Sequence, residues 1–155
     1  MDTAVMDAAV ITFKPHPDAK SRKSSAVALI KFLLKMNTPE VLPKHLEKLI
    51  DAMLWTITEA DGKYNTRHRS DRALRCTDNN ALAHEHVYPK KGMIKRLKQA
   101  RSEEEVDQIL SLAIGCTVMR DEHVLLHGLD HGDGWERYRK ANVGVVNIET
   151  GQRVI

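Results

Sequence analysis

Two amphipathic helices account for the apolar pattern in the first half of the chain. The first is predicted to begin after Ser24 or Ser25 as N-cap, and its apolar positions lie three and four residues apart at Val27, Ile30, Leu33 and Leu34. The second is predicted over residues 43–57, where Pro43 fits because a first helical turn does not need its missing N–H group. We expect the two helices to pack as a hairpin and to form the core.

Short helices and short strands alternate in the second half. A basic helix is predicted over residues 92–100, and Ser102 with Glu105 forms a capping box that opens the next helix. The further predicted elements are a strand over residues 116–119, a short helix that Asp121 caps and that runs to Leu126 or His127, and a hairpin over residues 143–155. This order predicts one mainly helical α+β domain with a few short strands.

Three segments lack a helical period. Residues 1–23 are expected to form an N-terminal arm, with a short strand over residues 8–13. Residues 63–72 are basic without an apolar repeat, so we expect an exposed loop. Residues 130–134 are expected to form a turn, because they lack the alternating oxygen ligands and the distal glutamate of a calcium loop.

Composition places the chain among ordinary globular domains. Its 155 residues suffice for one domain with a sizeable core, and 42% of them are hydrophobic, which argues against wholesale disorder. No apolar run is long enough for a bilayer, and acidic residues stand where a secretory signal would be positive. Cys76 and Cys116 lie 40 positions apart without a CxxC partner, which argues against a disulfide scaffold or thiolate zinc site and favours a cytoplasmic location.

Positive charge is concentrated in the middle of the chain. Residues 63–101 carry 11 Lys and Arg against three acids, a local charge of +8, whereas the rest carries 13 against 18, or −5. This asymmetry indicates a basic face for a polyanion, and we expect a nucleic acid, with DNA favoured over RNA. The residues expected to contact its phosphates are Lys63, Arg67, Arg69, Arg72, Lys90, Lys91, Lys95 and Lys98.

Two segments carry candidate chemistry. Residues 84–89, His-Glu-His-Val-Tyr-Pro, place a carboxylate beside an imidazole on an extended stretch. Residues 116–127 form a strand that enters a helix, on which His123 and His127 project from one face. A divalent cation needs converging carboxylate or imidazole ligands, and histidine is the usual general base near neutral pH. Both needs are met if the two segments lie side by side.

Together the two segments resemble the HNH, or ββα-metal, nuclease family over residues 84–127. In that family an Asp-His or His-His pair followed by a proline lies on a β-hairpin, and a histidine on the next helix completes the metal site. Carried across, Glu85 matches the metal-binding acid, His86 the general base and Pro89 the proline. His123 matches the helical ligand, and His127 matches an extra ligand that some members place one turn later.

The resemblance implies metal-dependent hydrolysis of nucleic-acid phosphodiesters, as by an endonuclease, with Mg²⁺ or Mn²⁺ expected and Zn²⁺ as the alternative. Arg120 or Lys90 is expected to hold the non-bridging phosphate oxygens. The sequence departs from the family in two main ways. No Asn stands between Val87 and Glu122 to match the family's central Asn, and 37 positions separate His86 from His123, which is longer than usual.

Two other classes of function fit the same residues. In one, the protein binds nucleic acid without cleaving it, and its histidines are structural. In the other, a small interaction or inhibitor module presents its basic face to an acidic protein. Loss of cleavage in His86→Ala would separate the hydrolase from both, and competition by DNA would separate the two binders.

Overall fold

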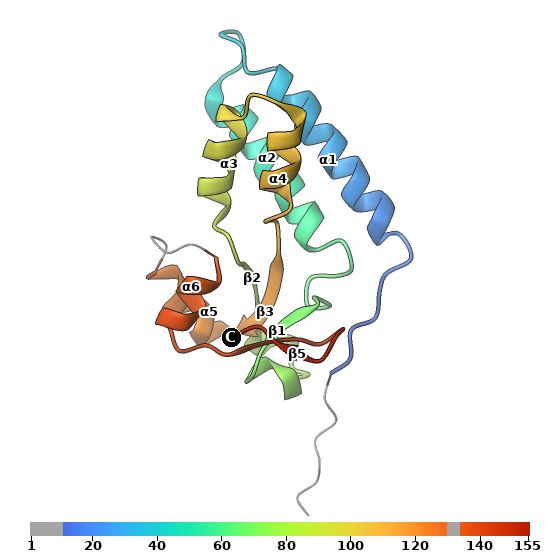
Figure 1. Cartoon of the computed structure of the whole chain (residues 1–155), viewed down its shortest axis with the longest axis vertical. Coiled ribbons are helices and arrows are strands. Elements are labelled where there is room, and N and C mark those ends of the chain that lie inside the picture. The colour runs from blue at the N-terminus through green and yellow to red at the C-terminus, as the bar shows by residue number, and fades with distance from the viewer. Residues whose placement is uncertain (1–10, 130–133) are drawn as a thin grey trace, which may run out of the picture.

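The computed structural model describes residues 11–129 and 134–155, which form the expected α+β fold (Figure 1). Within these residues there are six α-helices: α1 (Ala19–Lys35), α2 (Pro43–Thr58), α3 (Lys90–Gln99), α4 (Glu103–Leu110), α5 (Arg120–His127) and α6 (Trp135–Lys140). The strands are β1 (His68–Ser70), β2 (Leu82–His86), β3 (Gly115–Met119), β4 (Val145–Asn147) and β5 (Gln152–Arg153). In Figure 1, α1 to α4 form the upper half and the sheet lies below them, with α5 and α6 to one side.

The five strands form one mixed sheet in the order β2-β3-β1-β4-β5, so β2 is an edge strand. β1 runs parallel to β3, and the other three pairings are antiparallel. β2 and β3 are thus a hairpin whose connection, residues 87–114, contains both α3 and α4.

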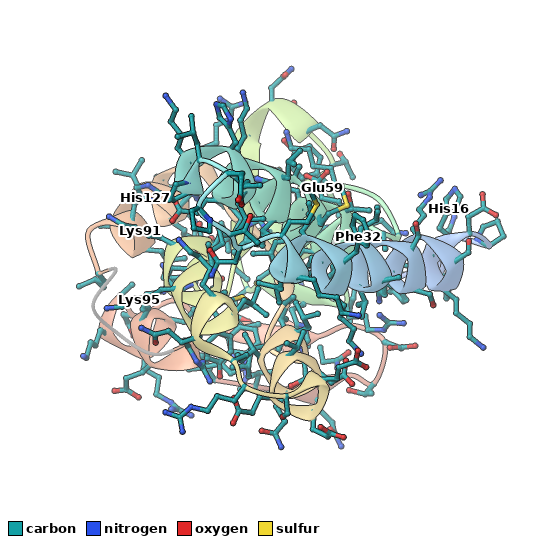
Figure 2. The ribbon with its side chains drawn as sticks, turned by 90° about the horizontal axis from the view of Figure 1, so that it is seen from above. His16, Phe32, Glu59, Lys91, Lys95 and His127 are labelled. Carbon is teal, nitrogen blue, oxygen red and sulfur yellow. The ribbon has the colours of Figure 1, made fainter. Side chains whose placement is uncertain are left out.

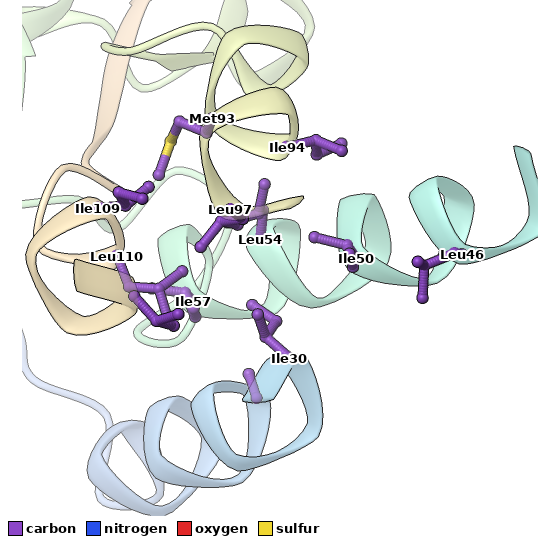
Figure 3. Close-up of a cluster of buried hydrophobic side chains, with 12 residues drawn as sticks. Ile30, Leu46, Ile50, Leu54, Ile57, Met93, Ile94, Leu97, Ile109 and Leu110 are labelled. Carbon is purple, nitrogen blue, oxygen red and sulfur yellow. The ribbon is translucent and has the colours of Figure 1, made fainter. Parts of the chain in front are cut away.

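The predicted hairpin of α1 and α2 is confirmed, and it contributes to the larger of two apolar cores. Figure 3 shows the side chains of α2 converging with those of α1, α3 and α4. A second core lies between the sheet and the helices α5 and α6, and it includes Val118, Leu126 and Tyr138. Tyr88 packs against both cores, so the segment that follows β2 joins the two halves.

The predicted serine cap of α4 is also confirmed, but the reciprocal bond of the expected capping box goes to Arg101 instead of Ser102. Ser102 Oγ accepts a hydrogen bond from the Glu105 N–H at 3.1 Å, and the Glu105 carboxylate accepts one from the Arg101 N–H at 2.7 Å. The bond to Ser102 satisfies a free N–H group in the first turn of α4, and the bond from Arg101 holds the residue before the N-cap.

Some predicted boundaries are wrong. Residues 63–72 are not a simple loop, because β1 lies within them and pairs with both β3 and β4. α1 begins at Ala19, before Ser24, and the chain preceding it is held by hydrogen bonds from Ile11 to Leu74 and from His16 to Asp61. Residues 11–23 are therefore not a free arm, while residues 1–10 lie outside the described part of the chain, as do residues 130–133 of the expected turn.

The helix expected to have Asp121 as its N-cap begins at Arg120, with Met119 as N-cap. The buried carboxylate of Glu122 replaces the expected Asp121 cap, since it accepts hydrogen bonds from the Met119 N–H at 2.8 Å and from Ser70 Oγ at 2.6 Å. None of the described helices has the length and apolar character needed to cross a membrane.

Candidate metal centre

A β-hairpin and the helix after it bring Glu85, His123 and His127 together. β2 pairs with β3 so that Glu85 lies opposite Cys116, and α5 starts directly after β3 and packs back on both strands. Oε2 of Glu85 accepts a hydrogen bond from Nδ1 of His123. Each of the three side chains offers one ligand atom, and these atoms all lie within 4.8 Å of one another. The residues predicted as metal ligands therefore form a group that could hold a metal ion.

The group runs from the interior to the surface. Glu85 is 5% exposed, His123 is half-buried and His127 is exposed. All three line a cleft of about 790 Å³, so a cation can enter from the His127 side and meet the carboxylate at the far end. Three protein ligands leave coordination positions open for water or substrate, which is typical of catalytic rather than structural metal sites.

Arg137, on α6, fixes the carboxylate of Glu85. Its Nη2 lies 3.1 Å from Glu85 Oε1 and also donates to the carbonyl oxygens of His86 and Val87, at 2.7 and 2.8 Å. Its Nη1 donates to the Leu126 carbonyl at 3.2 Å, so one guanidinium, only 1% exposed, joins β2 to α5. A buried carboxylate needs such a partner, because an unpaired buried charge is costly. With Oε1 so engaged, Oε2 is the oxygen that faces the histidines.

The two histidines beside Glu85 project from the opposite face of β2, as strand alternation requires. The His84 ring lies 5.2 Å from that of Trp55, and the His86 ring packs edge-on against the same indole at 4.4 Å. His86 therefore does not join the Glu85, His123 and His127 group. Because β2 is an edge strand, the cleft reaches both of its faces, and His84 and His86 line it too.

The Lys63 carbonyl and the Thr58 hydroxyl, at the end of α2, together set the tautomers of the two rings. His84 Nδ1 lies 2.7 Å from the Lys63 carbonyl and must donate to it, so in the neutral ring Nε2 is an acceptor. The Thr58 hydroxyl lies 3.0 Å from that nitrogen and 3.3 Å from the Trp55 carbonyl oxygen, so its single proton is directed at these two acceptors. The same oxygen lies 3.0 Å from His86 Nε2 and accepts from it. Nδ1 of His86 is then the unprotonated nitrogen, and it makes no hydrogen bond with the described residues.

Burial keeps both rings neutral. Desolvation lowers the pKa of His84 to about 4, although its bond to the Lys63 carbonyl acts in the other direction. Desolvation, aided by the nearby His84, lowers the pKa of His86 to about 3. Gly115 is part of this packing, because a Cβ there would lie 2.6 Å from Cε1 of His84.

The predicted basic residues differ in exposure and in what they contact, and Lys95 is exposed outside this cleft. Arg120, Lys63 and Lys91 line the cleft, and all three are exposed. Lys90 also lines it, but its ammonium bonds Asp51 at 2.8 Å and lies 4.3 Å above the Trp55 ring, so its charge is compensated.

Arg69 is the clear correction. It is 2% exposed and donates to the carbonyl oxygens of Ala73 and Tyr64, so it stabilises the fold and cannot reach a nucleic acid. The other predicted phosphate contacts with carboxylate partners are Arg67 with Glu149, Arg72 with Asp121 and Lys98 with Glu47.

Sequence reasoning missed Arg137 and Thr58. Arg137 is one of four charged residues in the short segment Trp-Glu-Arg-Tyr-Arg-Lys, and only the fold shows which of them is buried. Thr58 follows the last apolar residue of α2 and carries no motif of its own.

Comparison of the whole chain with models of known protein families, with curated proteins and with solved structures found no match.

Proposed function

We propose that this protein is a metal-dependent phosphodiesterase acting on nucleic acid through an HNH-like site. The observation that carries the proposal is the convergence of Glu85, His123 and His127 on a β-hairpin and its following helix. That is the arrangement expected from the resemblance, and it forms despite the long connection between the strands.

The donor set favours some cations over others. One carboxylate and two imidazoles suit Mn²⁺ or Zn²⁺ better than Mg²⁺, which prefers oxygen ligands and keeps several waters. A divalent cation held there supplies positive charge to the phosphate and to the leaving oxygen. Iron oxygenases share a two-histidine, one-carboxylate set, so the donors alone do not select hydrolysis. The basic rim of the cleft, Lys63, Lys91 and Arg120, favours an anionic substrate.

His86 is the proposed general base, acting through Nδ1. The bond from its Nε2 to Thr58 leaves Nδ1 with the lone pair that a base needs, and the low pKa keeps the ring unprotonated at neutral pH. So low a pKa also makes the ring a weak base in the free protein. A negative phosphate bound in the cleft raises that pKa and so strengthens the base. Arg120, exposed at the rim, is the proposed donor to a non-bridging oxygen.

The test is nicking of supercoiled plasmid, and cleavage of a structured RNA, with Mn²⁺, Mg²⁺ or Zn²⁺ and then with EDTA. We expect metal-dependent cleavage that Glu85→Gln and His86→Ala each abolish. His45→Ala is the matched control, since His45 is an exposed histidine on α2 outside the cleft. Absence of cleavage with every metal would reject the hydrolase, and retained DNA binding would then favour the non-catalytic binder.

A further inference from the structure

A second groove continues from the candidate metal cleft. It lies between α2 and α3, has a volume of about 770 Å³ and shares Asp51 and Lys91 with the metal cleft. Its lining includes Lys44 and Lys48 from α2, and Lys91, Lys95 and Lys98 from α3. In Figure 2, seen from above, Lys91, Lys95 and His127 lie along the same side of the molecule.

The carboxylates of this groove are already paired. Glu47 bonds Lys98 at 2.8 Å and Asp51 bonds Lys90 at 2.8 Å. Lys44, Lys48, Lys91 and Lys95 have no carboxylate partner among the described residues. The groove therefore keeps a net positive charge that the fold itself does not neutralise.

The spacing of these lysines is regular. Lys44 and Lys48 are four residues apart on α2, and Lys91 and Lys95 are four apart on α3. Each pair thus lies on one helical face, separated by about 6 Å along the helix axis. Like charges at this spacing repel and destabilise a helix, so the arrangement has a cost in the free protein. A row of phosphates along an extended backbone, whose charges repeat at a similar interval, would remove that cost.

We propose that the groove between α2 and α3 binds the phosphodiester backbone of the nucleic-acid strand that flanks the bond to be cleaved. This inference rests on the proposed function, since it takes the strand to continue from the metal cleft. Apart from Ile94, the groove offers no large apolar side chain. Protein–protein interfaces are built around aromatic, Met and Arg anchors and are depleted in Lys, so an acidic protein fits this lining less well. Without aromatic rings to stack on bases, the contact is to phosphate and independent of sequence.

The experiment measures binding of a fluorescein-labelled 20-bp DNA duplex by anisotropy in EDTA, over a series of salt concentrations. One variant replaces Lys44, Lys48, Lys91 and Lys95 with Gln. The matched control replaces the exposed Lys14, Lys20, Lys35 and Lys140 with Gln, which removes the same charge elsewhere on the chain. Circular dichroism and thermal melting verify that both variants fold.

We expect the groove variant to reduce the slope of log K against log salt by about 3 to 4, since each phosphate contact contributes about 0.9. The control should keep most of the wild-type slope. The proposal would be overturned by an equal loss of slope in the two variants, or by an unchanged slope in the groove variant. It would also be overturned if the wild-type protein bound an acidic protein but no DNA. Because EDTA prevents metal-dependent cleavage, the result is independent of the nicking assay, and either proposal can fail while the other stands.

Discussion

Glu85 and His123 are 38 positions apart in the sequence, yet their side chains share a hydrogen bond across the gap between β2 and α5. A metal ion at this site would take the place of that bond, because the same carboxylate oxygen and an imidazole nitrogen would become its ligands. Metal binding requires neutral imidazoles and competes with protons, so the affinity should fall as the pH is lowered.

Arg137→Met tests how the carboxylate is held. It leaves the 5% exposed Glu85 without its guanidinium partner, and breaking such a buried pair costs about 3 kcal/mol. We expect that loss in the free energy of unfolding measured by urea denaturation. The control is Arg139→Met, two residues along the same helix, where the exposed pair with Glu136 contributes little.

Thr58→Val tests the role of the hydroxyl in setting the His86 tautomer. Valine has a similar shape but neither donates nor accepts, so the ring loses the bond that keeps Nδ1 unprotonated. We expect kcat for DNA cleavage to fall on the order of tenfold to a hundredfold, with metal affinity unchanged. Thr58→Ser should restore activity and Thr56→Val should have no effect. A parallel loss of metal binding would show that Thr58 acts on the whole site and not on the ring.

The buried histidines predict a loss of stability in acid. In the unfolded chain both rings bind a proton near pH 6.5, whereas in the metal-free folded protein His84 and His86 do so only at pKa values of about 4 and 3. Unfolding therefore takes up protons below pH 6.5, and the free energy of unfolding falls as the pH falls. Each ring should contribute about 2 kcal/mol between pH 7 and pH 5. Urea denaturation in EDTA should show roughly half of this fall in His86→Gln, and the full fall in His45→Gln.

Gly115→Ala tests the close packing of β3 on His84. The new methyl group would lie 2.6 Å from Cε1 of the ring, so the ring must move and lose its bonds to Thr58 and Lys63. We expect a destabilisation of about 1 to 3 kcal/mol and reduced cleavage. Gly92→Ala is the control, since a Cβ there meets no atom within 4 Å. Equal effects of the two substitutions would contradict the packing seen at Gly115.

Much of the fold follows from local signals in the sequence. The apolar period of residues 43–57 specifies α2, and the side chain of Ser102 specifies the start of α4. β1 could not be predicted, because His-Arg-Ser has neither apolar alternation nor strand-forming side chains. Its conformation comes from pairing with β3 and β4, which are distant in the sequence.

In the candidate site, too, the residues with local sequence signals could be predicted and those placed by the fold could not. The ligands could be predicted from local patterns. His123 and His127 are four residues apart and share one helical face, and Glu85 is a carboxylate directly beside His86. The residues that hold them could not be predicted. Arg137 comes from a helix 52 positions beyond Glu85, and the burial that makes it important is a property of the assembled fold. Arg69 was wrongly predicted to contact phosphate for the same reason. Its basic neighbours in the sequence gave no sign that its side chain would be buried.

Calorimetric titration of the EDTA-treated protein with Mn²⁺ and Zn²⁺ tests the metal centre most directly. We expect one ion per chain, with affinity at least about tenfold weaker in Glu85→Gln and in His127→Ala, and unchanged in His86→Ala, whose ring lies on the other face of β2. No binding of either metal by the wild-type protein, or the same affinity in His127→Ala as in the wild type, would contradict the site.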